Sequence, residues 1–114
     1  MIQTHQTQNG IDVVTIAGRL VAADAPEARE NLKGIVEGGT GKLIVDLSGV
    51  SFIDSSGLSV LISAFKLIRV KGGRMLLSGI SKNVQTLLEL TRLSEIFEMY
   101  ASTEAALDSM GKAP

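Results

Sequence analysis

Three residues with hydrogen-bonding side chains, Asp54, Ser55 and Ser56, stand next to one another in mid-chain and are followed by Gly57. Their side-chain oxygens can accept hydrogen bonds from the first free N–H groups of a helix. One such residue is enough to cap a helix, and a glycine lets a second backbone come close. The cluster therefore predicts a helix start that also has a role at the surface.

Catalysis by these hydroxyls lacks partners in the sequence. A serine nucleophile needs a base, but the single histidine, His5, falls in the expected first strand as a surface residue, and no Gly-x-Ser-x-Gly motif surrounds Ser55. With no cysteine and one histidine, the usual zinc sites cannot be assembled. Asp46 lacks a receiver-type acidic cluster and is expected to be a half-buried, hydrogen-bonded carboxylate, and the glycine-rich stretch 38–42 lies between a helix and a strand, the reverse of a phosphate loop. We therefore expect no enzyme, no metal and no cofactor.

A different chemistry suits Ser55, namely acceptance of a phosphate. Phosphorylation would bring about −1.5 to −2 charges and three acceptor oxygens to the helix start, where free N–H groups and the helix dipole tolerate an anion. A partner packed there would not tolerate it, because roughly 4 kcal/mol of unpaired charge burial already changes affinity about a thousandfold. Ser56 is the second candidate acceptor and is more simply a cap, whereas Asp54 is expected to bond backbone N–H groups and to help position the Ser55 hydroxyl. The plain alternative is that all three residues only cap the helix.

Length and charge limit the classes of partner. The 114 residues, taken as one domain over 1–114, carry a net charge of −1, so no overall field attracts nucleic acid or an anionic membrane. Aromatic residues make up 4% of the chain, which does not favour a base-stacking platform. No apolar run approaches the roughly 20 residues of a membrane span, and no secretion signal precedes the first strand. A soluble, cytoplasmic protein is expected.

Hydrophobic periodicity predicts an α/β fold. The expected strands are 2–7, 11–16, 43–47, 75–77 and 97–100, and the expected helices begin at about 24, 56, 81 and 102. Asn9-Gly10 is a strong hairpin signal between the first two strands. The third strand is nearly all apolar, as a strand covered on both faces must be, and the helix after it makes a right-handed crossover to a parallel strand. We predict a mixed sheet of about five strands, opened by an antiparallel hairpin, with about four helices mainly on one side.

The helix that follows Ser55 has a second set of apolar residues. One stripe is formed by Leu58, Leu61, Ile62, Phe65 and Ile68. Val60, Ala64 and Leu67 fall almost opposite this stripe on a helical wheel, so they are expected to face away from the sheet. An apolar ridge there would give a partner surface to bury beside Ser55. The alternative is that these three are scattered surface aliphatics.

Several stretches resemble the STAS domain of bacterial anti-sigma factor antagonists, and the likeness covers nearly the whole chain. They are residues 43–47, the loop 52–58, Gly72-Gly73, Ile80-Ser81 and residues 87–93. The Asp-Ser-Ser-Gly-Leu loop is the most specific, and the resemblance places the family's phosphorylatable serine at Ser55. Two residues depart from the family pattern, Val21 in place of an acidic or amide residue and Arg92 in place of glycine.

The resemblance implies a switch between partners. In such proteins the unphosphorylated antagonist binds an anti-sigma factor that is also a serine kinase of the histidine-kinase-like ATPase type, and this frees a sigma factor. Phosphorylation reverses the binding and a metal-dependent serine phosphatase restores it. Loop residues Asp54, Ser55, Ser56, Gly57 and Leu58 would then contact the partner, and Asp24, three residues after Val21, would join them. The alternative is a STAS scaffold or sensor that works unphosphorylated in a larger signalling assembly, or with a bound nucleotide or lipid.

Overall fold

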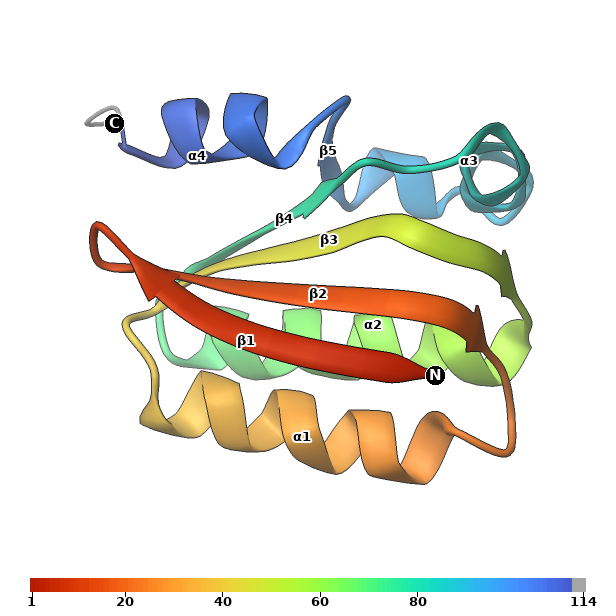
Figure 1. Ribbon diagram of the computed structural model, residues 1–114, viewed down its shortest axis with the longest axis horizontal. Coiled ribbons are helices and arrows are strands. Elements are labelled where there is room, and N and C mark those ends of the chain that lie inside the picture. Colours follow the sequence, from red (N-terminus) through yellow and green to blue (C-terminus); the bar gives the residue numbers. More distant parts are fainter. Residues whose placement is uncertain (112–114) are drawn as a thin grey trace.

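A five-stranded mixed sheet carries the four helices in the computed structural model, which describes residues 1–111 (Figure 1). The elements in chain order are β1 (Ile2–Gln8), β2 (Ile11–Leu20), α1 (Ala25–Gly38), β3 (Lys42–Ile53), α2 (Ser55–Val70), β4 (Arg74–Ser78), α3 (Lys82–Leu90), the 3₁₀ turn η1 (Leu93–Glu95), β5 (Glu98–Tyr100) and α4 (Thr103–Gly111). The strands lie side by side in the order β1-β2-β3-β4-β5. The expected fold class is confirmed.

The hairpin and the crossovers form as their sequences predict. β1 pairs antiparallel with β2 around Asn9 and Gly10, whose φ angles of 53° and 75° suit a tight hairpin turn. The pairs β2–β3, β3–β4 and β4–β5 are all parallel. Ser81 and Ser102 cap α3 and α4, since their hydroxyls accept the N–H groups of Val84 and Ala105. Parallel strands end at the same edge of the sheet, so the β2–α1 and β3–α2 loops lie next to each other.

Helices cover both faces of the sheet unequally. Leu43, Val45 and Leu47 of β3 share one core with α1, α2 and α3, whereas Ile44 packs on the other face against α4. Figure 1 shows α1 and α2 below the sheet and α4 above it. β3 is therefore buried on both faces, as its apolar sequence predicts.

β3 extends beyond the strand next to it. It pairs with β4 only from Lys42 to Asp46, because β4 ends at Ser78 and the chain leaves the sheet toward α3. β3 continues to Ile53 with only β2 beside it, among residues 1–111, and α3 packs against this extension. The carboxylate of Asp46 is half-buried and accepts the N–H of Ser48 at 2.9 Å, as the sequence predicts. α2 therefore starts beyond the part of the sheet that β4 covers.

A buried carboxylate ties the hairpin to the end of α1. Asp12 is 4% exposed and accepts the Thr40 N–H at 2.9 Å and the Thr7 hydroxyl at 3.0 Å, while His5 Nε2 lies 2.9 Å from its Oδ1 atom. Burial raises the pKa of Asp12, but the hydrogen bonds from Thr40, His5 and Thr7 outweigh this and lower the pKa below its ordinary value of 3.8. The charged form is therefore more stable in the folded protein than in the unfolded chain.

This carboxylate should make the protein sensitive to acid. A lowered folded-state pKa contributes stability above the unfolded pKa, near 3.8, and the contribution is lost as the pH falls through the folded pKa. We expect Asp12→Asn to lower the free energy of unfolding at pH 7 by about 1–3 kcal/mol, because the Thr40 N–H loses its charged acceptor. Urea unfolding at pH 7 and pH 3 checks this. The difference between wild type and variant should shrink at pH 3, and a constant difference would contradict it.

Candidate functional site

Asp54 joins two loops at the edge where α2 begins. It is the N-cap of α2, and its Oδ1 accepts the N–H of Gly57 at 3.0 Å. Its Oδ2 accepts the N–H of Ala22, in the β2–α1 loop, also at 3.0 Å. The hydrogen bond from Gly57, and after it the one from Ala22, lowers the pKa of Asp54. The sequence predicts the bond to the helix start, whereas nothing in it indicates the bond to Ala22.

Ser55 is the first residue of α2, and its side chain is exposed. Within residues 1–111 its hydroxyl makes no hydrogen bond, although its carbonyl oxygen accepts the Ser59 hydroxyl at 3.1 Å. Ser56 is half-buried. The Ser55 hydroxyl is therefore the more accessible of the two candidate acceptors, and it stands at a helix N-terminus where an anion is tolerated.

Gly57 is buried where α2 crosses the end of β2. A Cβ atom on this residue would collide with the carbonyl oxygen of Leu20 and would lie 2.8 Å from the Ile53 Cγ2 atom. Leu58, the next residue, is 6% exposed and belongs to the core. Gly57 thus fixes how closely α2 approaches the sheet, and Leu58 can offer a partner little surface.

The expected apolar ridge on α2 is wrong. Val60 is 0% exposed and Ala64 is 2% exposed, and Leu67 is half-buried against the same core. The physical reason is that α1 packs along α2, so that this second face of α2 is buried as well. Val60 and Ala64 cannot contact a partner in this fold.

Asp24 does not cap α1 with its side chain, contrary to the expectation. It occupies the N-cap position with helical φ and ψ angles, and no hydrogen bond joins its carboxylate to the helix. Its N–H bonds to the carbonyl oxygen of Val21 at 2.9 Å, which closes a turn around Ala22. Asp24 is half-buried in the loop that Asp54 holds through Ala22, so the structure brings this loop and the α2 start together.

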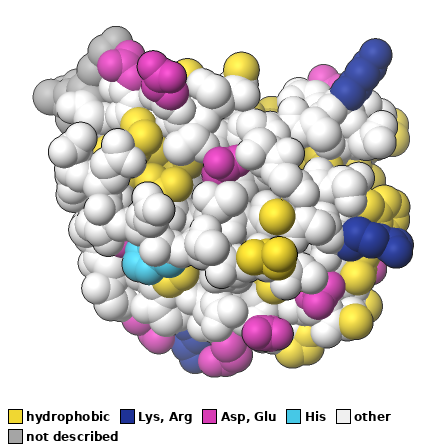
Figure 2. Space-filling model, viewed as in Figure 1, with side chains coloured by type: hydrophobic (Ala, Val, Ile, Leu, Met, Phe, Trp, Pro, Cys, Tyr) yellow, Lys and Arg dark blue, Asp and Glu magenta, His cyan; other side chains and the backbone are white. Residues whose placement is uncertain are grey.

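An apolar groove opens beside Ser55, and the sequence does not indicate it. We call it the α3 groove; it has a volume of about 540 Å³, with Phe52, Ser55 and Leu58 on one wall and Val84, Leu87 and Leu90 of α3 on the other. Phe52 is 47% exposed and Leu90 is 78% exposed. In Figure 2 hydrophobic side chains gather along the right-hand side, where Figure 1 shows α3 and the start of α2. The off-stripe position of Leu90 in α3 is the one signal in the sequence that points to it.

Comparison with known proteins identifies the family. The STAS domain family matches residues 3–106. A relative from Bacillus subtilis, an anti-sigma-B factor antagonist, is 33% identical over 106 residues, which cover 93% of this chain and 95% of the relative. The chain belongs to the STAS family of anti-sigma factor antagonists.

Solved structures of STAS proteins share the fold. An anti-sigma factor antagonist from Mycobacterium paratuberculosis superposes with a TM-score of 0.89 at 22% identity, over 97% of this chain and 94% of that chain. The phosphorylated form of the Bacillus cell fate determinant SpoIIAA superposes with a TM-score of 0.75 at 20% identity, over 95% and 98% of the two chains. SpoIIAA is also known in its unphosphorylated form. These likenesses establish the STAS fold of this chain.

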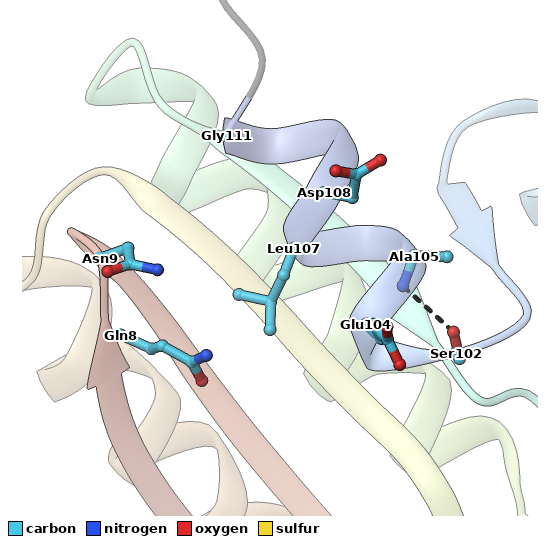
Figure 3. A pocket seen from close by; sticks show the side chains of 8 residues that line it. All are labelled: Gln8, Asn9, Ser102, Glu104, Ala105, Leu107, Asp108 and Gly111. Carbon is cyan, nitrogen blue, oxygen red and sulfur yellow. Dashed lines mark hydrogen bonds between the residues drawn. The ribbon is translucent and has the colours of Figure 1, made fainter.

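A second hollow in the STAS domain lies at the other end of the sheet. Figure 3 shows it between the β1–β2 turn at Gln8 and Asn9 and helix α4, with Leu107 pointing toward the turn. Its volume is about 680 Å³, and the Ser102 hydroxyl on its edge accepts the Ala105 N–H at 3.1 Å. β3 starts near the hairpin and ends at Ile53, so this hollow is separate from the Ser55 loop.

The described part of this STAS domain offers no metal site. Residues 1–111 contain no group of three or more His, Asp or Glu side chains that could hold an ion. Over the same residues, no helix is both long and apolar enough to cross a membrane.

Proposed function

We propose that this STAS protein is an anti-sigma factor antagonist controlled by phosphorylation of Ser55. The unphosphorylated form binds an anti-sigma factor that is also a serine kinase of the histidine-kinase-like ATPase type, and the sigma factor is released. A metal-dependent serine phosphatase reverses the modification. The observation that carries the proposal is the exposed Ser55 hydroxyl at the first position of α2, which has no hydrogen-bond partner among residues 1–111.

The surroundings of Ser55 suit a switch that leaves the fold intact. A phosphate there meets the N-terminal end of a helix of 16 residues, whose dipole and free N–H groups stabilise negative charge. Asp54 already accepts backbone N–H groups with both of its oxygens, so modification need not break these bonds. The same phosphate would add about two negative charges next to the Asp54 carboxylate, and a partner packed on this end would have to bury them. The Bacillus and Listeria relatives support the choice of partner, since they are antagonists of anti-sigma factors.

In this proposal the protein is a substrate and not an enzyme. The only histidine in the sequence, His5, lies in β1 against Asp12 and is remote in the fold from α2, so it cannot serve Ser55 as a base. The partners are proteins, and neither nucleic acid nor a membrane takes part directly. A cytoplasmic location follows from the proposed partners, because a sigma factor and an ATP-dependent kinase act there.

Phosphorylation by a cognate kinase tests the proposal. Each histidine-kinase-like ATPase of the source organism is purified and incubated with the protein and ATP, and the product is analysed by tandem mass spectrometry. We expect one kinase to add a single phosphoryl group to Ser55, with Ser56→Ala still modified and Ser55→Ala unmodified. Modification of Ser56 alone, or no modification by any of these kinases, would refute the proposed switch.

A further inference from the structure

The α3 groove shares a wall with the proposed switch. Ser55 lines the groove together with Phe52 and Leu58, so any molecule seated in it lies next to the Ser55 side chain. The groove exists because β4 ends at Ser78 while β3 continues to Ile53, which leaves the space between this extension and α3 unfilled by a strand. A site for an apolar group and the modified hydroxyl are thus parts of one surface.

The apolar surface extends beyond the groove. Leu90 is 78% exposed and Phe52 is 47% exposed, on opposite walls. Exposed aliphatic and aromatic side chains that border a concave apolar site are typical of protein interfaces. A small molecule inside the groove would leave the outer parts of Phe52 and Leu90 in water, whereas a protein segment can cover both. The extent of the surface therefore favours a protein as occupant.

Charge around the groove points to the character of that segment. Among the described residues that line the groove, Asp54 alone is charged, and both of its oxygens are bonded to backbone N–H groups. Arg19 lies over the ring of Phe52, with its Cζ atom 5.2 Å from the ring centre. Lys82 and Arg92, both exposed, flank the α3 wall in sequence, and Figure 2 shows Lys or Arg side chains among the hydrophobic ones on this side. A segment with apolar side chains flanked by acidic ones complements this surface.

We infer that the α3 groove receives apolar side chains from the same anti-sigma factor that the Ser55 loop binds. The inference rests on the proposed function and adds a second contact to it. The apolar anchor supplies affinity and the neighbouring hydroxyl supplies control. A phosphate on the groove wall places its charge against the seated apolar side chains, so the anchor cannot bury them without desolvating the phosphate.

Calorimetry with groove variants tests this inference. The probe is the purified kinase that modifies Ser55, saturated with ADP so that no phosphoryl transfer occurs during titration. We expect Leu90→Ala and Phe52→Ala each to raise the dissociation constant by about 10-fold or more, because both remove exposed apolar anchors. Val70→Ala is the matched control, since Val70 is 87% exposed at the far end of α2, and it should change the dissociation constant by less than about twofold. Thermal unfolding by circular dichroism confirms that all three variants fold.

The outcomes separate the inference from the proposed function. If the kinase binds and phosphorylates the wild type, and both groove variants bind as tightly, the groove contact is refuted and the Ser55 switch stands. If no kinase binds the wild type, both are refuted. A titration with lauric acid covers the remaining case. If Leu90→Ala weakens the binding of this fatty acid but leaves kinase affinity unchanged, the groove holds a small amphiphile and the inferred occupant is wrong.

Discussion

Replacing Ser55 with aspartate should weaken binding to the anti-sigma kinase by about 100-fold, or roughly 3 kcal/mol. The side chain at this position is exposed at the start of α2 and lines the α3 groove, so the new carboxylate would be buried in the complex next to Asp54. Neither the helix nor the sheet should be disturbed, because acidic residues are favourable in the first turn of a helix. Calorimetry or surface plasmon resonance with the purified kinase measures the loss.

Two variants make this measurement specific. Ser55→Ala should bind within about threefold of the wild type, because removal of an exposed hydroxyl costs the interface little. Ser102→Asp adds the same charge at the start of another helix, where Ser102 caps α4, and should leave the affinity unchanged. Equal affinities for Ser55→Asp and Ser55→Ala would show that the partner does not cover Ser55.

Gly57→Ala should be the most destabilising single methyl group in the Ser55 loop. Its Cβ atom would collide with the Leu20 carbonyl oxygen and would approach Ile53, both of which belong to the sheet. Overpacking of this kind costs about 1–3 kcal/mol, and the melting temperature should fall by roughly 5–10 °C. Because α2 must move away from β2 to relieve the collision, the bond between Ala22 and Asp54 should lengthen too. Calorimetric melting measures the first effect, and the Ala22 amide exchange rate measures the second.

Gly34→Ala provides the matched control. Gly34 lies within α1 and is exposed, and a Cβ atom added there would have no other atom within 4 Å outside its own stretch of helix. The same substitution should therefore raise stability by about 0.5–1 kcal/mol, as expected for alanine in a helix interior. If Gly57→Ala were tolerated as well as Gly34→Ala, the close packing of α2 on β2 would be incorrect.

Most of the fold could be predicted because its signals are local. Asn9 and Gly10 specify a hairpin turn through their preference for positive φ, and the unbroken apolar run of β3 requires cover on both faces. Arg92 shows the limit of such rules. It adopts φ 62°, a left-handed conformation that glycine reaches at less cost, at the position where the resemblance to the family indicates glycine.

The errors concern how elements pack against one another. A helical wheel for α2 identifies the stripe that faces the sheet, but it carries no information on where α1 lies, so it wrongly predicts that Val60 and Ala64 are exposed. The sequence around Lys71 predicts only the end of a helix, yet the Lys71 Nζ atom donates to the carbonyl oxygens of Val36 and Glu37 at 2.8 Å and so closes the C-terminal end of α1. The α3 groove could not be predicted for the same reason, since it depends on where β4 ends relative to β3.

The early end of β4 separates two demands on this sequence. Within residues 1–111, no strand pairs with β3 beyond Asp46 on the side of α3, so the helix that forms the outer wall of the groove is held by side-chain packing and not by the sheet ladder. Exposed residues of α3 can therefore change during evolution while every backbone bond of the sheet is retained. A chain built in this way can acquire a new binding specificity without losing its ability to fold.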